Sequence, residues 1–212
     1  PLDEYDVPET LIFQAAEKTD TAIFVIGRNS GGEECDRHLP EDYYLTRSEE
    51  SLLKDICTHF ANVVIVLNVN GLIDLSWVKK YASIKSLLFI GIPGEEGASA
   101  LAGILTGEIN PSGKLAVTIA EHYEDYPSAD HFSWDKEHLE NILDYESYGL
   151  SSEENGSTGF TKSPVTVYWE DIYTGYRYFD TFGKQVLYPF GYGLSYTAFA
   201  ISDALVKKQN GG

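Results

Sequence analysis

The sequence predicts an α/β protein with a mostly parallel sheet and helices on both faces. Two observations carry this prediction. Short, continuous apolar runs alternate with longer segments of helical periodicity, and glycine, proline, asparagine or aspartate separates them. Such alternation at short spacing is typical of βαβ units, in which a crossover helix joins two parallel strands. After residue 120 the alternation stops, and an irregular aromatic-rich segment follows towards the C-terminus.

Four apolar runs are the expected strands. They are 21–27 (TAIFVIG), 62–69 (NVVIVLNV), 86–92 (SLLFIGI) and 114–120 (KLAVTIA). A continuous run, in contrast to strict alternation, indicates a strand that is covered on both faces of a parallel sheet. We therefore expect these four strands to form one buried sheet.

The segments between the strands are the expected helices. They are 8–20, 46–61, 74–82 and 93–108. Thr46, with Glu49 three residues later, has the spacing of a capping box, in which each residue bonds the backbone of the other. Proline and acidic residues open the last segment, and Gly107 is placed to end it.

Composition excludes several partners. The chain has 212 residues, of which 43% are hydrophobic, so it contains enough apolar residues for a sizeable core. The formal net charge of −18 repels a phosphate backbone, so we expect no nucleic-acid partner. No apolar run reaches the roughly 18 residues of a membrane span, and we expect no membrane partner.

Methionine is absent, and position 1 is Pro1, so we expect the chain to be a piece of a longer polypeptide. Two cysteines, Cys35 and Cys57, do not make a disulfide framework, nor do they have the spacing of metal ligands. No signal-peptide pattern is present. These features favour the cytoplasm, although a leader elsewhere in a longer protein would equally allow secretion.

The glycines of the predicted sheet do not indicate nucleotide binding. Gly91, Gly94 and Gly97 are spaced three apart and follow the third strand, whereas the dinucleotide fingerprint follows the first. Glu95 and Glu96 lie where a phosphate would need neutral or positive donors. Histidines in a metal-ligand spacing are also missing, since 122, 131 and 138 lie far apart. We expect no cofactor and no metal.

A loop between the first strand and the second helix has an unusual density of charge. Residues 26–45 read IGRNSGGEECDRHLPEDYYL. The loop follows the carboxyl end of a parallel strand, where sites in open α/β sheets are built. Gly31 and Gly32 allow the backbone to project a neighbouring carboxylate, and Glu33 and Glu34 come next. The plain alternative is an acidic loop that only faces water.

Residues 167–199 hold 12 of the 28 aromatic residues of the chain. Two interpretations stay open. The aromatic side chains seal an edge of the sheet or contact another domain, or they form a surface on which sugar rings stack.

Several motifs together resemble those of glycoside hydrolase family 3, in its second, α/β-sandwich domain. The resemblance runs from about 3–12 to 191–199. It predicts that 1–199 is this domain, with 121–166 a surface excursion and 200–212 a tail. The stretches that carry it are IGRNSGGEECDR, VVIVLNVNGLIDLSW, GIPGEEGASALAGILTGEINPSGKLAVT, YEDYPS, EDIYTGYRYFDTFG and YPFGYGLSYTAF.

This resemblance implies a retaining exo-β-glycosidase, most often a β-glucosidase that removes terminal β-linked glucose from oligosaccharides or glucosides. A (β/α)8 barrel of the same polypeptide would supply an aspartate nucleophile, and the sandwich domain a glutamate acid/base. The barrel is absent from these 212 residues, so we expect the fragment alone to be inactive. The alternatives are a β-xylosidase of the same family and a non-catalytic carbohydrate-binding module or pseudoenzyme.

The family loop usually reads Ser-Gly-Glu-Gly-x-Asp-Arg. Counting back from Asp36 and Arg37 places the acid/base on Glu33. This chain has one extra residue before that position, and Glu34 stands where the family has glycine, so Glu34 is the alternative. The resemblance implies that Arg28, Asp36 and Arg37 support the loop or lie near the substrate.

Overall fold

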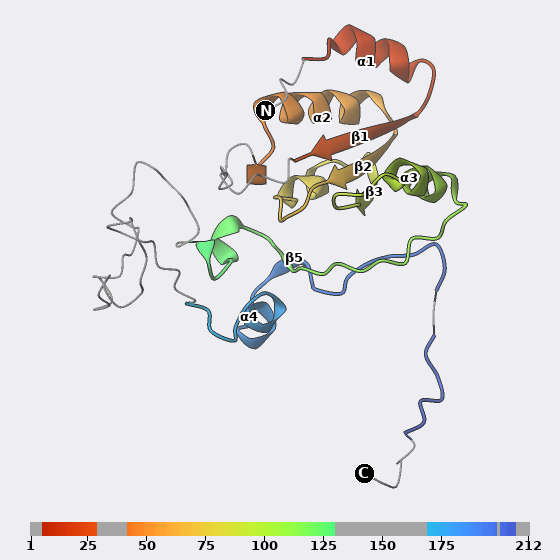
Figure 1. Ribbon diagram of the computed structural model, residues 1–212. Helices are drawn as coiled ribbons and strands as arrows, with labels where there is room; N and C mark the ends of the chain where they lie inside the picture. Colours follow the sequence, from red (N-terminus) through yellow and green to blue (C-terminus); the bar gives the residue numbers. More distant parts are fainter. Residues whose placement is uncertain (1–5, 29–41, 130–168, 199, 207–212) are drawn as a thin grey trace, which may run out of the picture.

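The computed structural model describes residues 6–28, 42–129, 169–198 and 200–206, and its first half contains a parallel three-stranded sheet (Figure 1). The strands are β1 (Thr21–Gly27), β2 (Asn62–Asn68) and β3 (Ile84–Phe89), in the spatial order β1-β2-β3. Both pairs are parallel. The predicted α/β class with a parallel sheet is therefore confirmed.

Helical turns occur in all four segments where they were expected. They are α1 (Glu9–Ala16), α2 (Arg47–His59), the 3-10 helix η2 (Ser76–Lys80) and α3 (Gly97–Thr106). Helices α1 and α2 lie together on one side of the sheet, whereas α3 lies away from them, next to β3 (Figure 1). None of the helices in the described ranges is long and apolar enough to cross a membrane.

Helix α2 begins at the predicted capping box. The Thr46 hydroxyl accepts a hydrogen bond from the Glu49 backbone N–H at 3.1 Å, and the Glu49 carboxylate accepts one from the Thr46 N–H at 2.8 Å. Two N–H groups of the first turn are thereby satisfied. Helix α3 ends at Gly107, whose φ of 81° lies in the left-handed region that glycine adopts without strain.

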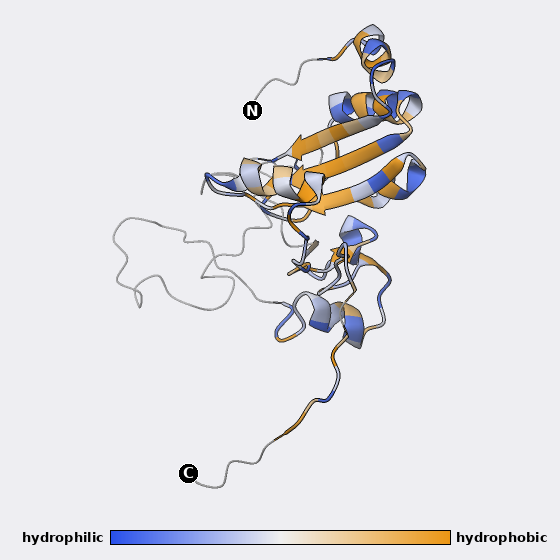
Figure 2. Cartoon of the chain, turned by 90° about the vertical axis from the view of Figure 1, so that its right-hand side faces the viewer, coloured by the Kyte–Doolittle hydropathy of each residue, from blue (hydrophilic) through white to orange (hydrophobic). Residues whose placement is uncertain are grey.

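The core lies mainly between the sheet and α2. The register pairs Phe24 with Ile65 and Ile65 with Leu87 across the sheet. Side chains on this face of the sheet belong to one apolar cluster, together with side chains from the helices and loops. The three strands are the most hydrophobic part of the sheet-and-helix region (Figure 2). The buried members of the cluster are Ile12, Phe24, Ile26, Leu45, Leu53, Phe60, Val63, Ile65, Leu67, Val69, Ile73, Leu75, Trp77 and Ile119.

The two faces of β1 differ from those of β2. In β2, Val66 points away from Ile65 and is also fully buried, so this central strand is covered on both sides. In β1, Ile23 and Val25 are each 53% exposed. The prediction that 21–27 is covered on both faces is thus wrong within the described residues, because an apolar run does not distinguish a central strand from one that is paired on one edge.

The predicted fourth strand of the sheet, 114–120, is a correction. Only Ile119–Ala120 is a strand (β4), and it pairs antiparallel with β5 (Val186–Tyr188) in a separate two-stranded sheet. Upstream, the Leu115 N–H donates to the Tyr192 carbonyl, and the Gly191 N–H donates to the Leu115 carbonyl, both at 2.8 Å. The backbone partners of this apolar run lie some 70 residues later in the chain, at residues 186–192. Local sequence does not specify pairing over such a separation.

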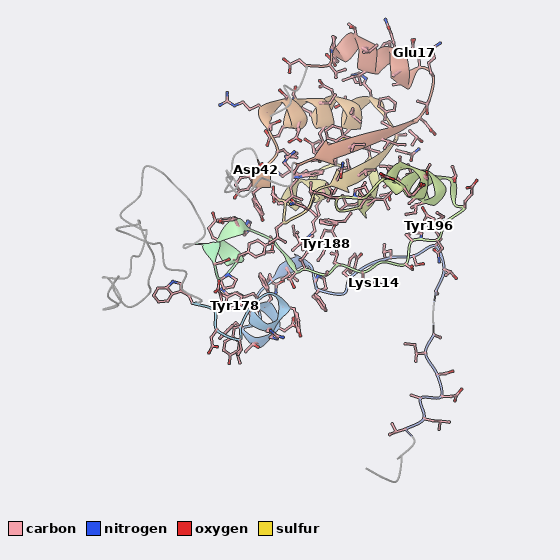
Figure 3. The ribbon with its side chains drawn as sticks, in the orientation of Figure 1. Glu17, Asp42, Lys114, Tyr178, Tyr188 and Tyr196 are labelled. Atoms are coloured by element: carbon pink, nitrogen blue, oxygen red, sulfur yellow. The ribbon has the colours of Figure 1, made fainter. Side chains whose placement is uncertain are left out.

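The aromatic-rich segment is hydrogen-bonded to residues 104–120 and runs beside them (Figure 3). Lys114 donates through Nζ to the Gly193 carbonyl, and the Tyr196 hydroxyl donates to the Ile104 carbonyl at 2.9 Å. At Gly193 an added Cβ would lie 2.7 Å from the Gly113 oxygen, so the close approach of the two backbones requires glycine there. These contacts attach the segment to residues 104–120 of the same chain, and none of them is to a strand of the three-stranded sheet, whose edge the first interpretation named.

Replacing Thr46 by alanine is expected to lower the free energy of unfolding by about 1 kcal/mol, because one N–H of the first turn of α2 loses its acceptor. Thr58→Ala, on an exposed position of the same helix, is the matched control and should stay within about 0.5 kcal/mol of the parent. Urea denaturation followed by circular dichroism measures both. Equal losses in the two variants would contradict a capping role.

Candidate active site

Arg28 marks the point at which the chain leaves the sheet. Its backbone N–H donates to the Asn68 carbonyl at 3.1 Å, which continues the β1–β2 pairing by one residue. The next described residue is Asp42. Arg28 and Asp42 therefore flank the segment 29–41 at the carboxyl end of β1, the edge of a parallel sheet where sites are usually built.

The Arg28 side chain makes five hydrogen bonds to four residues. Nη1 and Nη2 donate to the two Glu49 carboxylate oxygens at 2.6 and 2.7 Å. Nε donates to the Asp42 carbonyl at 3.1 Å, Nη2 to the Tyr44 carbonyl at 3.2 Å and Nη1 to the Gly27 carbonyl at 2.8 Å. A guanidinium has five N–H donors, so the hydrogen-bonding capacity of the group is fully used.

Glu49 links this network to α2. Its side chain and that of Arg28 are each only 6% exposed, so the ion pair is buried. The carboxylate oxygen that accepts from Arg28 Nη2 is also the one that accepts from the Thr46 N–H. It lies in the first turn of the helix, where the positive end of the helix dipole stabilises an anion. One carboxylate thus caps α2 and holds Arg28.

Arg28 is the only residue of the predicted site that lies within the described residues. Glu33, Glu34, Asp36 and Arg37 all belong to segment 29–41 and lie outside them, as does Cys35. The network fixes both ends of that segment. The chain enters it directly after Arg28 and leaves it directly before Asp42.

Aromatic rings pack behind the exit of this segment. Tyr43 is 4% exposed and meets the rings of Tyr44, Tyr123 and Tyr126 edge to face, with centroids 5.0, 5.2 and 6.4 Å away. Tyr126 in turn meets Phe179 of α4 (Tyr176–Thr181) at 5.7 Å. This tyrosine cluster joins residues 42–44 to the aromatic-rich segment, a connection that the sequence analysis missed.

Burial changes the acidity of the tyrosine cluster. Desolvation raises the pKa of Tyr43 strongly, and the nearby Tyr126 and Asp74 raise it further. The Tyr43 hydroxyl has no well-aligned hydrogen-bond partner in the described ranges, although the Tyr126 hydroxyl is close enough to add to the shift. Burial also raises the pKa of Tyr126, while its hydrogen bond from the Ala120 N–H, at 2.9 Å, opposes the change.

Other aromatic side chains remain at the surface. Tyr176 and Phe190 stack face to face with centroids 4.8 Å apart, and both are partly exposed. Trp169 and Phe182 are more than half exposed. The sugar-stacking interpretation of this segment therefore has candidate side chains, although two of them, Tyr176 and Phe190, stack on each other. In the described part of the chain, no three His, Cys, Asp or Glu side chains are grouped as metal ligands.

A protein-family model described as the glycosyl hydrolase family 3 C-terminal domain matches residues 9–196. The chain belongs to glycosyl hydrolase family 3. Residues 9–196 take in nearly the whole length, so the resemblance inferred from the sequence motifs is confirmed.

Relatives of the family 3 domain are longer enzymes. Beta-glucosidase A of Butyrivibrio fibrisolvens is 36% identical over 228 residues, which covers 95% of this chain and 24% of that protein. An exo-alpha-(1->6)-L-arabinopyranosidase of Bifidobacterium longum is 33% identical over 159 residues, or 74% of this chain and 17% of that protein. A solved beta-glucosidase from Paenibacillus barengoltzii superposes with a TM-score of 0.71 at 35% identity, over 93% of this chain and 19% of that one.

Glu49 shows why sequence reasoning missed half of the network in the family 3 domain. The capping-box spacing identified Glu49 as a helix cap, because that role depends on a separation of three residues. Its pairing with Arg28 spans 21 residues, and no spacing rule connects the two. The apolar strand before Arg28 gave a partial signal of this pairing. A buried arginine needs an acidic or hydrogen-bonding partner, and Arg28 directly follows that strand.

Tyr43→Phe is expected to make the family 3 domain less sensitive to alkali. Above about pH 10 the unfolded state loses the phenolic proton while the folded state keeps it, so unfolding becomes more favourable as pH rises. The tyrosine thus contributes a decline of at most about 1.4 kcal/mol per pH unit, which the phenylalanine variant lacks.

Urea denaturation at a series of pH values measures this difference. Below about pH 9 neither state of Tyr43 ionises, so the stability difference between parent and variant should be constant there. Curves that stay parallel from neutral pH to pH 11 would show that Tyr43 ionises equally in both states.

Proposed function

We propose that this chain is the acid/base-supplying domain of a retaining, β-glucosidase-like exo-glycosidase. The enzyme would remove terminal β-linked glucose from oligosaccharides or glucosides. The observation that carries the proposal is the family match over residues 9–196, with relatives named beta-glucosidases that are several times longer than the chain. The remainder of those relatives leaves room for the (β/α)8 barrel that the resemblance predicts as partner.

Retaining hydrolysis needs two carboxyl groups about 5–5.5 Å apart, one on each side of the scissile bond. An ionised aspartate from the barrel would attack the anomeric carbon. Glu33 would first donate a proton to the leaving oxygen and then take one from the attacking water. Contact with the barrel would remove water from this glutamate and raise its pKa towards the value that a general acid needs.

The described residues support this assignment through the positions of the two residues that flank the segment containing Glu33, Arg28 and Asp42. Arg28 follows β1 at its carboxyl end and directly precedes segment 29–41, and its guanidinium donates to the carbonyl of Asp42, the residue that directly follows the segment. A carboxyl group must be held within a fraction of an ångström to act as an acid in proton transfer. Asp36 and Arg37 would support the segment from within.

Sugar specificity is a separate question. Beta-glucosidases dominate the names of the relatives, but an L-arabinopyranosidase is also 33% identical to this chain. The −1 sugar pocket would lie mostly in the barrel, so a β-xylosidase is the alternative within the same chemistry. A panel of nitrophenyl glycosides separates the two, and glucoside should be turned over with the highest kcat/KM.

A non-catalytic carbohydrate-binding module or pseudoenzyme is the alternative outside this chemistry. The complete reading frame discriminates between the two. A neighbouring (β/α)8 pattern with a placed aspartate supports the enzyme. A nucleotide-binding domain, the remaining candidate of this fold class, would be stabilised against heat by ATP or NAD, and the acidic residues Glu95 and Glu96 argue against it.

The 212-residue chain alone is expected to hydrolyse no aryl glucoside, because only one of the two required carboxyl groups is on it. Release of nitrophenol by the purified chain and by the longer protein measures this. The chain should show no turnover, and the longer protein should be active. Turnover by the chain alone, undiminished by repeated purification, would contradict the division of the site between two domains.

Glu33→Gln in the longer protein is expected to lower turnover of substrates with poor leaving groups by about 10²–10⁴-fold. Activated nitrophenyl substrates should lose less in the glycosylation step, because their leaving groups need little protonation. Measurement of kcat/KM across a leaving-group series tests this.

Glu34→Gln is the matched variant, since it removes the neighbouring carboxylate. It should leave the leaving-group dependence of the parent intact. The opposite pattern, with Glu33→Gln nearly silent, would transfer the acid/base role to Glu34.

A further inference from the structure

The Arg28 guanidinium bonds three parts of the chain: the end of β1, residues 42–44 and the first turn of α2. One bond goes to the carbonyl of the preceding Gly27, at the end of β1. Two go to the carbonyls of Asp42 and Tyr44, on the far side of segment 29–41. The other two go to Glu49 in the first turn of α2. The network therefore joins the entrance and the exit of the segment to the same helix.

This arrangement contributes more to geometry than to stability. Both charges are removed from water, and the desolvation cost of such a pair largely cancels its attraction, so apolar residues would stabilise the fold as well. Apolar contacts, however, do not fix the orientation of the groups that they join, whereas hydrogen bonds do. A planar guanidinium bonded at both carboxylate oxygens, and at carbonyls on its other N–H groups, can adopt one orientation only.

We propose that Arg28 is a positioning residue for the acid/base glutamate. Its guanidinium holds the Asp42 and Tyr44 carbonyls next to the end of β1, so it fixes the relative positions of the residues that precede and follow segment 29–41, the segment that contains Glu33. This inference rests on the proposed function. It adds that the orientation of the acid/base depends on a buried residue that contacts neither the sugar nor the reacting atoms.

Lysine cannot replace arginine in this role. Its ammonium group would keep the charge opposite Glu49, but it is a compact group with three donors and cannot bond both carboxylate oxygens and three carbonyls at once. Arg28→Lys therefore removes some of the hydrogen bonds to Gly27, Asp42, Tyr44 and Glu49 while it retains a charged pair. Glu49→Gln is the complementary change. Glutamine at this position of a capping box still bonds the Thr46 N–H, but the anionic partner of Arg28 is lost.

The test uses the longer protein that contains this chain. Parent, Arg28→Lys, Glu49→Gln and Glu33→Gln are compared on aryl and alkyl glucosides that range from activated to poor leaving groups. Arg47→Lys and Glu50→Gln are the matched controls, because both are exposed residues of the first turn of α2. The melting temperature of every variant is recorded beside kcat and KM.

The expected result is a leaving-group-dependent loss. Arg28→Lys and Glu49→Gln should lower kcat on poor leaving groups by about 10–10²-fold, as an ångström-scale displacement of a catalytic group does. KM, and the rate of glycosylation with activated substrates, should change little. The two controls should match the parent. A merely structural role would instead lower the melting temperature and reduce the rates on all substrates equally.

Two outcomes overturn the inference. One is a loss that is uniform across the substrates in both Arg28→Lys and Glu49→Gln, and the other is kinetics equal to those of the controls. If Arg28→Lys does not fold, Glu49→Gln decides alone. Glu33→Gln separates this failure from that of the proposed function. If it shows the leaving-group dependence and the Arg28 variant does not, only the positioning role falls. If neither Glu33→Gln nor Glu34→Gln shows it, the acid/base assignment itself is wrong.

Discussion

The parallel pairing of β1 with β2 is the constraint on which the rest of the structure depends. Its register runs from Thr21 opposite Asn62 to Gly27 opposite Asn68, and Arg28 extends it by one more hydrogen bond. A parallel pair requires a crossover, and α2 supplies it. Because the strands run in the same direction, the end of β1 lies at the sheet edge where α/β proteins build their sites.

The Arg28–Glu49 pair connects the end of β1 to α2, and Arg28 also bonds the carbonyls of Asp42 and Tyr44. The helix that crosses over the sheet begins with the carboxylate that receives the guanidinium, so strand, segment and helix share one network. The tyrosine cluster around Tyr43 continues the connection to α4 and the aromatic-rich segment. If the proposed acid/base role is correct, such rigidity would serve it, because proton transfer tolerates little displacement.

Elements governed by short-range rules were predictable. The capping box at Thr46, the glycine that ends α3 and the three parallel strands all depend on residues within one turn or one apolar run. The run 114–120 shows the limit. Its apolar pattern is that of a strand, but its backbone partners lie near residues 186–192, and the parallel sheet did not include it. Pairing over such a separation depends on the shape of the whole fold.

The sequence by itself determined the α/β class and the family. These follow from local periodicity, cap chemistry and motifs that are contiguous in the chain. Only the tertiary structure decided that Arg28 faces Glu49, that Tyr43 is buried among other rings, and that one face of β1 stays open. Each of these depends on which side chains meet in space, and neither spacing nor composition specifies that for residues far apart in the chain.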